Sequence, residues 1–199
     1  MNLKLTGKTA LVSGSTKGIG FAIATGLAGE GARVIVNGRS EKAVAQAKEQ
    51  IDQTVPDAKV ESFAGDLSTA AATETLLQRF PLVDILVNNL GIFEAKPFED
   101  ISDEDWRRFF EVNVLSGVRL SRAYLPGMKQ RNWGRIVFIS SESAINTPAE
   151  DDPLRHDKDR AACCFARPCP IVCRHSSHGQ CGVARSNKFC RCGGICGTA

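Results

Sequence analysis

The residues best suited to chemistry lie close together near the N-terminus, in the stretch Ser13-Gly14-Ser15-Thr16-Lys17-Gly18-Ile19-Gly20. The apolar run at residues 9–12 before it is typical of a buried parallel strand, and residues 21–28 after it follow a helical pattern. The first glycine permits a tight turn, and the other two let a phosphate approach the backbone. Because a helix N-terminus offers unpaired N–H groups and a partial positive charge, this stretch is suited to hold a pyrophosphate. An ordinary strand-to-helix turn is the alternative.

The glycine spacing is G-x-x-x-G-x-G rather than the common dinucleotide-binding pattern G-x-G-x-x-G. It resembles the spacing of the short-chain dehydrogenase/reductase family. The resemblance implies hydride transfer between a nicotinamide cofactor and a carbonyl or alcohol substrate. The residues that it implies for cofactor binding in this stretch are Gly14, Ser15, Thr16, Lys17, Gly18, Ile19 and Gly20.

An arginine follows the second predicted strand, residues 33–37, and no acid occurs before Glu41. In Rossmann-type folds an acid near this point binds the ribose hydroxyl of NAD, whereas an arginine accommodates the 2′-phosphate of NADP. Lys17 adds a second cation near the same phosphate. Arg39 and Lys17 therefore favour NADP as the cofactor, with NAD as the second choice. Two solvated surface cations are the alternative interpretation.

A third predicted strand, residues 59–64, leads into Gly65 and then Asp66 and Leu67. The resemblance implies that the Asp66 side chain and the backbone amide of Leu67 contact the adenine of the cofactor. The alternative is that Asp66 caps the helix that follows.

The fourth predicted strand, residues 84–87, runs into Asn88-Asn89-Leu90-Gly91. These residues resemble the N-N-A-G motif of the family, with leucine in place of alanine. The resemblance implies that Asn88, Asn89 and Gly91 brace the central strands and border the riboses of the cofactor.

Two candidate catalytic residues come from later motifs. A long helix is predicted from Asp103 to about Lys129, and within it Glu111-Val112-Asn113-Val114 resembles the N-V-N segment of the family. The resemblance implies that Asn113 interrupts the helix and orders a water; a solvent-facing asparagine is the alternative. Ser141 follows the fifth predicted strand, residues 135–139, and is implied to hydrogen-bond the substrate carbonyl oxygen. An ordinary polar strand end is the alternative there.

Five predicted strands alternate with helices over residues 1–150, and this alternation predicts an α/β fold. The expected architecture is a Rossmann-type doubly wound parallel sheet with its ligand at the carboxyl ends of the strands. The pattern stops after the fifth strand, so we expect a truncated sheet followed by an irregular tail. The expected domains are an NAD(P)-binding domain at residues 1–150 and a Cys/Arg-rich tail at residues 151–199.

The chain as written lacks the general acid of the family. The family's chemistry requires Tyr-x-x-x-Lys shortly after the serine, on one helix face, where the lysine lowers the pKa of the tyrosine. The single tyrosine, Tyr124, precedes Ser141, and the residue four positions later is Met128. The composition also changes here, because all eight cysteines and all three histidines follow residue 155.

A shift of reading frame near Glu150 explains both features. Residues 151–159 have permitted codons that, read one base along, give Met-Ile-His-Tyr-Gly-Met-Thr-Lys. This reading places a tyrosine at the position of Leu154 and a lysine at that of Lys158. The same shift converts residues 178–187 into Thr-Val-Asn-Ala-Val-Leu-Pro-Gly-Pro-Thr, which resembles the sixth strand and the Pro-Gly loop of the family.

A genuine metal-binding tail is the alternative, although its cysteine spacings match no regular zinc pattern, and we assign no metal ligands. Three functions remain open: an oxidoreductase that is impaired as written, a nucleotide-binding module without catalysis, and a metal-binding protein. A net charge of +3 is too small to argue for nucleic acid, and no apolar run approaches membrane-spanning length. With no apolar leader, we expect a cytoplasmic protein with a small-molecule substrate. Family members often form homo-oligomers.

Overall fold

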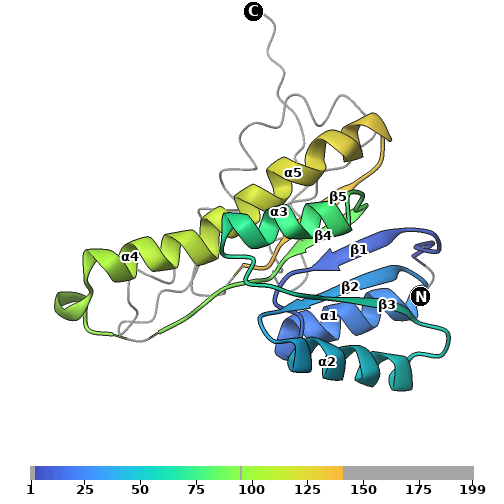
Figure 1. The fold of residues 1–199 in the computed structure, drawn as a ribbon, viewed down its shortest axis with the longest axis horizontal. Helices are drawn as coiled ribbons and strands as arrows, with labels where there is room; N and C mark the ends of the chain where they lie inside the picture. Colours follow the sequence, from blue (N-terminus) through green and yellow to red (C-terminus); the bar gives the residue numbers. More distant parts are fainter. Residues whose placement is uncertain (1–2, 95, 141–199) are drawn as a thin grey trace, which may run out of the picture.

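The computed structural model describes residues 3–94 and 96–140, which contain a five-stranded parallel sheet (Figure 1). Its strand order is β3-β2-β1-β4-β5, so the direction of winding reverses next to β1. This order is that of a doubly wound Rossmann sheet, and it confirms the predicted fold class. The strands are β1 (Thr9–Val12), β2 (Arg33–Gly38), β3 (Lys59–Ala64), β4 (Ile85–Asn88) and β5 (Arg135–Phe138).

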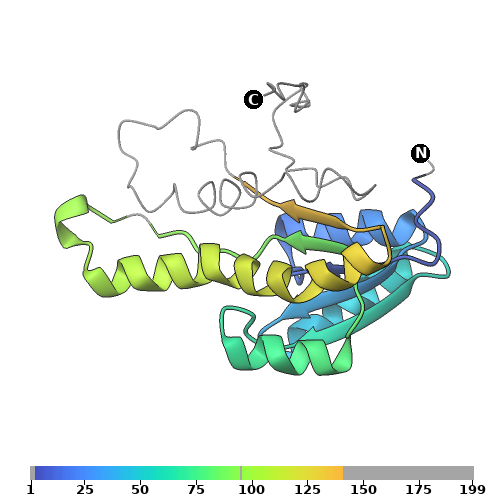
Figure 2. The same cartoon turned by 90° about the horizontal axis from the view of Figure 1, so that it is seen from above.

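Helices cover both faces of the sheet, with α1 and α2 on one face and α3 and α5 on the other (Figure 1). The predicted long helix consists of α4, η2 and α5, which follow one another as a nearly continuous rod extending beyond the sheet (Figure 2). The helical bounds are α1 (Gly18–Gly29), α2 (Glu41–Thr54), α3 (Ala70–Arg79), η1 (Phe98–Asp100), α4 (Asp103–Phe110), η2 (Glu111–Leu115) and α5 (Ser116–Gln130).

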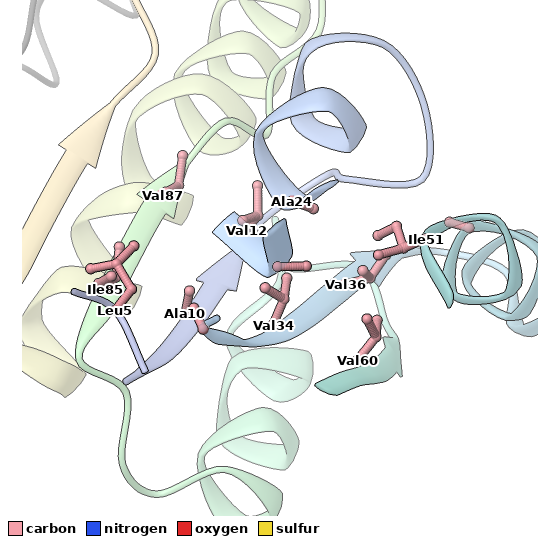
Figure 3. Packing of buried hydrophobic residues seen from close by; sticks show 13 residues of the cluster. Leu5, Ala10, Val12, Ala24, Val34, Val36, Ile51, Val60, Ile85 and Val87 are labelled. Atoms are coloured by element: carbon pink, nitrogen blue, oxygen red, sulfur yellow. The ribbon is translucent and has the colours of Figure 1, made fainter. Parts of the chain in front are cut away.

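The central strands β1, β2 and β4 are largely apolar on both faces because helices cover each face of the sheet. Along β1, Ala10 and Val12 face α1 and α2, whereas Leu11 between them joins the cluster on the side of α3 and α5. Figure 3 shows the first cluster, in which valines of the central strands meet Ala24 of α1 and Ile51 of α2. This two-sided burial holds the carboxyl ends of the strands in place.

Two expectations concern residues outside the described part of the chain. One is the assignment of Ser141 at the end of the fifth strand, and the other is the irregular tail at residues 151–199.

The buried face of β4 provides a test of this core. Leu86 is 0% exposed in the cluster beneath α3 and α5, so Leu86→Ala leaves a cavity and is expected to lower the free energy of unfolding by about 2–5 kcal/mol. Leu82 lies just before the same strand and is 62% exposed, so it is the matched control. Leu82→Ala is expected to change the free energy of unfolding by less than about 0.5 kcal/mol. Urea denaturation followed by circular dichroism measures both changes. Similar losses in the two variants would contradict this packing.

Candidate functional site

The candidate site lies where the glycine stretch leaves β1 and enters α1. Gly14 and Gly18 both have a φ of +61°, a conformation that L side chains rarely adopt. A Cβ atom at Gly20 would overlap the Asn89 side-chain nitrogen and lie 2.5 Å from the Gly14 carbonyl oxygen. The turn therefore depends on glycine at these three positions, for backbone conformation at two and for close packing at the third.

The first turn of α1 differs from the first turns of α2, α3 and α4. Those helices begin with Ser40, Thr69 and Ser102, whose side chains each accept a hydrogen bond from a backbone N–H of the first turn. The N-cap of α1 is Lys17, which makes no side-chain cap, and no acidic residue lies in its first turn. The unpaired N–H groups at the start of α1 can therefore bind an anion from outside the chain.

Hydrogen bonds join the end of β4 to the glycine turn. Asn89 Nδ2 donates to the carbonyl oxygens of Ser13 and Gly14, at 3.0 and 2.9 Å. In return, the Ser13 hydroxyl oxygen accepts the backbone N–H groups of Asn89 and Leu90, both at 3.0 Å. The Asn89 side chain is thus committed to holding the turn. Sequence analysis missed Ser13, for which the only signal was a small hydroxyl residue directly before the first glycine.

Asn88 and Gly91, the other candidates of this motif, lie in different surroundings. Asn88 is buried, its Nδ2 donates to the Ser121 hydroxyl of α5 at 3.2 Å, and its backbone oxygen accepts the Ile139 N–H at 3.0 Å. These bonds join the sheet to α5. The buried Asn88 Oδ1 has no hydrogen-bond partner within the described residues. Gly91 is exposed in the segment after β4.

The two candidate cations lie beside a close contact between the loop after β1 and the end of β2. Thr16 packs so closely against Gly38 that a Cβ atom at Gly38 would overlap its methyl group. Lys17 and Arg39 are the next residue on each side, and both are exposed. Neither forms an ion pair with any residue in the ranges that the structure describes. The start of α1 is therefore flanked by two positive charges that are available to an anionic ligand.

Asp66 closes a local turn instead of capping a helix. Its Oδ1 accepts the backbone N–H of Ser68 at 3.0 Å and the Ser68 hydroxyl at 2.7 Å. The N-cap of α3 is Thr69, so the interpretation of Asp66 as the cap is wrong. The Leu67 side chain is buried beneath α3 and α5, which leaves only its backbone for a ligand.

Asn113 lies in the π-helical segment η2, between α4 and α5. It is 7% exposed, so the alternative of a solvent-facing asparagine is wrong. Its Oδ1 accepts the Ile92 N–H at 2.8 Å, and its Nδ2 donates to the Ile92 carbonyl oxygen at 3.2 Å. The widened helical turn, a feature frequent at functional sites, thus ties the helix to the segment that follows β4.

Tyr124 is a core residue and cannot supply the missing acid. Its hydroxyl donates to the Phe80 carbonyl oxygen at 3.0 Å, and burial raises the pKa of the phenol above its usual value near 10. The side chain therefore stays protonated at any working pH. Its partner follows α3, near the amino end of β4 and remote from the glycine turn.

An ion-pair cluster holds the segment between β4 and α4. Lys96 Nζ lies 2.8 Å from an oxygen of Asp105, which also accepts from the hydroxyl and N–H of Ser102 in a capping box. Bonds from Lys96 and Ser102 lower the pKa of Asp105 to about 2. This carboxylate therefore remains charged, and the entry to α4 remains capped, through the neutral pH range.

The other surface features do not add a site. An open hollow of about 720 Å³ lies at the amino ends of β1, β2 and β3, and cations and acids lining it form the pairs Arg33–Glu61 and Lys48–Asp52. Within the described ranges, no group of His, Cys, Asp or Glu side chains is arranged to hold a metal. None of the helices in those ranges has the length and apolar character needed to cross a bilayer.

Comparison with known proteins gives a family match over most of the chain. A family model described as short chain dehydrogenase matches residues 8–150. The Bacillus subtilis (strain 168) protein called uncharacterized oxidoreductase YvaG is 54% identical over 145 residues, covering 73% of this chain and 55% of that protein. The D-beta-hydroxybutyrate dehydrogenase of Cupriavidus necator is 41% identical over 150 residues, covering 73% and 57%. The matched region thus spans a little over half of these relatives.

Solved structures show the same fold. The L-sorbose reductase of Gluconobacter frateurii, complexed with NADPH and L-sorbose, has a TM-score of 0.80 at 29% identity and covers 89% of this chain and 68% of that one. A metagenomic short-chain oxidoreductase in complex with NADP has a TM-score of 0.79 at 27% identity and covers 89% and 81%.

The packing at Gly20 yields a prediction with a control in the same helix. Gly20→Ala places a methyl group against Asn89 and Gly14, so it is expected to lower the free energy of unfolding by about 1–3 kcal/mol. A Cβ atom at Gly26 would have no atom within 4 Å, so Gly26→Ala is expected to raise the free energy of unfolding by about 0.5–1 kcal/mol. Thermal and urea unfolding of the two variants measures both changes. An equal change in the free energy of unfolding in the two variants would contradict the close packing at Gly20.

Proposed function

The chain belongs to the short chain dehydrogenase family, and on this premise we propose that it binds NADP(H) at the glycine turn as a hydride-transfer oxidoreductase. The observation that carries the proposal is the uncapped start of α1, which follows a glycine turn and is flanked by Lys17 and Arg39, two cations without an ion-pair partner among the described residues. Proteins of this family use NAD(P), and two related structures hold NADPH or NADP. The bound cofactor would supply or accept the hydride.

Several of the predicted cofactor residues have a role in this proposal that their surroundings support. The N–H groups at the start of α1 bind the pyrophosphate, and the glycines keep side chains out of its path. Arg39 and Lys17 bind the 2′-phosphate, which is the basis for preferring NADP over NAD. Asp66 and the Leu67 backbone border the adenine, and the segment Asn88–Gly91 lies beside the riboses.

The catalytic roles follow from the family resemblance. Asn113 would hold a water, with its side chain oriented by the two hydrogen bonds to Ile92. Ser141 would donate a hydrogen bond to the oxygen of a small carbonyl or alcohol substrate. The general acid is a tyrosine that the chain as written lacks, since Tyr124 is buried and bonded to Phe80.

We infer that the chain binds cofactor but turns over poorly, because residues 151–199 are out of frame. The family match stops at residue 150, and the composition changes just beyond it, which supports this division into a binding domain and an altered tail. A nucleotide-binding module without catalysis is the second candidate. The lack of a tyrosine and lysine pair after the fifth strand favours it for this chain.

The test of the proposal is titration of the full chain with NADPH and NADH, followed by the fluorescence of the reduced nicotinamide. We expect saturable binding of both, with NADPH the tighter ligand. In a frame-restored chain that carries the tyrosine and lysine, we expect NADPH-dependent carbonyl reduction about 10²–10⁴-fold faster than in the chain as written. If neither chain bound NADPH or NADH, the assignment of the glycine turn as a cofactor site would be overturned.

Removal of the flanking cations tests the cofactor preference. Arg39→Ala and Lys17→Ala are each expected to weaken NADPH binding by about tenfold, because a charge-assisted contact to the 2′-phosphate is lost. NADH binding should change by less than about twofold, because NADH lacks that phosphate. Lys48→Ala is the matched control, since this exposed cation of α2 is paired with Asp52 at 2.9 Å. Parallel loss of NADPH and NADH affinity would exclude a role in 2′-phosphate recognition.

A further inference from the structure

Asn37 is a polar residue enclosed within an otherwise apolar strand. It is 1% exposed near the end of β2, after the buried residues Val34, Ile35 and Val36. Its Oδ1 accepts the Gly14 N–H at 3.0 Å. Its Nδ2 donates to the Phe63 carbonyl oxygen at 3.2 Å and to the Gly65 carbonyl oxygen at 3.0 Å. One carboxamide thus bonds the loops after two different neighbouring strands.

The backbone of Asn37 strengthens the same junction. Its carbonyl oxygen accepts the Ser15 N–H at 2.8 Å, and its N–H donates to the Ser15 hydroxyl oxygen at 2.9 Å. The Ser15 hydroxyl donates in turn to the Val12 carbonyl oxygen at 2.7 Å. The glycine turn is therefore attached to β2 by three hydrogen bonds, all of which involve Asn37.

The chemistry of the junction selects asparagine. The glycine turn presents an N–H donor, which requires an acceptor, while the end of β3 presents two carbonyl oxygens, which require donors. A neutral carboxamide supplies both, whereas an ionised aspartate has no donor and would face two carbonyl oxygens. A buried polar group left without partners is costly, so the side chain is held in a single orientation.

We propose that Asn37 is a positioning residue that sets the distance between the glycine turn and the Gly65–Leu67 segment. This inference rests on the proposed function, in which the turn holds the pyrophosphate and the segment after β3 borders the adenine. A dinucleotide must contact both regions at once. Adenosine 2′-monophosphate reaches the glycine turn only through the Lys17 side chain, whose flexible four-carbon stem tolerates a change in that separation. Asn37 thereby couples the two halves of the cofactor site without contacting the cofactor's reacting atoms.

The experiment compares NADP⁺ with adenosine 2′-monophosphate as calorimetric ligands of the full chain. Asn37→Ala is expected to weaken NADP⁺ binding by about tenfold and to change binding of the monophosphate by less than about twofold. Tyr124→Phe is the matched control, because it removes a buried hydrogen bond to Phe80 outside the site. It should lower the melting temperature with both affinities unchanged. Equal weakening of both ligands in Asn37→Ala, or of neither, would overturn the inference.

Asn37→Asp is a second variant, which tests the inference even if Asn37→Ala does not fold. The new carboxyl keeps an acceptor for Gly14, and protonation restores one donor for β3. Burial beside two carbonyl oxygens raises its pKa, so NADP⁺ affinity in this variant should recover by about fivefold from about pH 8 to about pH 5.5. Lys17, Arg39 and Asp66 are charged groups on the adjoining loops, so the unchanged chain over the same pH range is the reference.

The outcomes separate this inference from the proposed function. If the unchanged chain binds neither ligand, the proposed function fails and the inference fails with it. If the unchanged chain binds both, and Asn37→Asp shows the same pH response as the unchanged chain, only the positioning role of Asn37 is overturned.

Discussion

The rest of the structure depends on one close contact, that of the glycine turn with the end of β4. Gly20 and the Gly14 carbonyl lie against Asn89 with no space for a Cβ atom, and Asn89 Nδ2 bonds two carbonyl oxygens of the turn. β1 and β4 are neighbours at the point where the strand order reverses. The contact therefore fixes the start of α1 beside the crevice in which doubly wound folds bind their ligands.

A second principle is that buried polar residues gather where the strands end. The interiors of β1 and β2 are apolar on both faces, and the first polar residues after these interiors are Ser13 and Asn37. Strand pairing stops at this edge, so backbone N–H and carbonyl groups need new partners. Ser13, Asn37 and Asn89 provide them, and the same hydrogen bonds that finish the sheet also shape the loops around the crevice.

The sequence predicted the elements well because their patterns are local. Apolar runs identified β1, β2, β4 and β5, a mixed run that leads into Gly65 identified β3, and the glycine spacing located the turn into α1. The polar partners were harder to predict, because the side-chain acceptor for the Gly14 N–H lies on the next strand and depends on register. The sequence shows Asn37 only as the end of a strand, and the alternative interpretation of Asp66 as a helix cap was wrong because Thr69 caps α3. Contacts between strand ends are tertiary, so no local pattern contains them.

The contacts that hold the glycine turn come from one part of the chain. The hydrogen bonds described around the glycine turn come from residues between Val12 and Leu90, on four adjacent strands and the loops that follow them. Tyr124, the single tyrosine of the chain, donates to the Phe80 carbonyl oxygen near the amino end of β4, at the opposite edge of the sheet. The shape of the glycine turn therefore depends on the ends of neighbouring strands, whereas Tyr124 stabilises the core. In the function that we propose, affinity for a dinucleotide would come from the ends of β1 to β4, and carbonyl reduction would in addition require a proton donor from outside them.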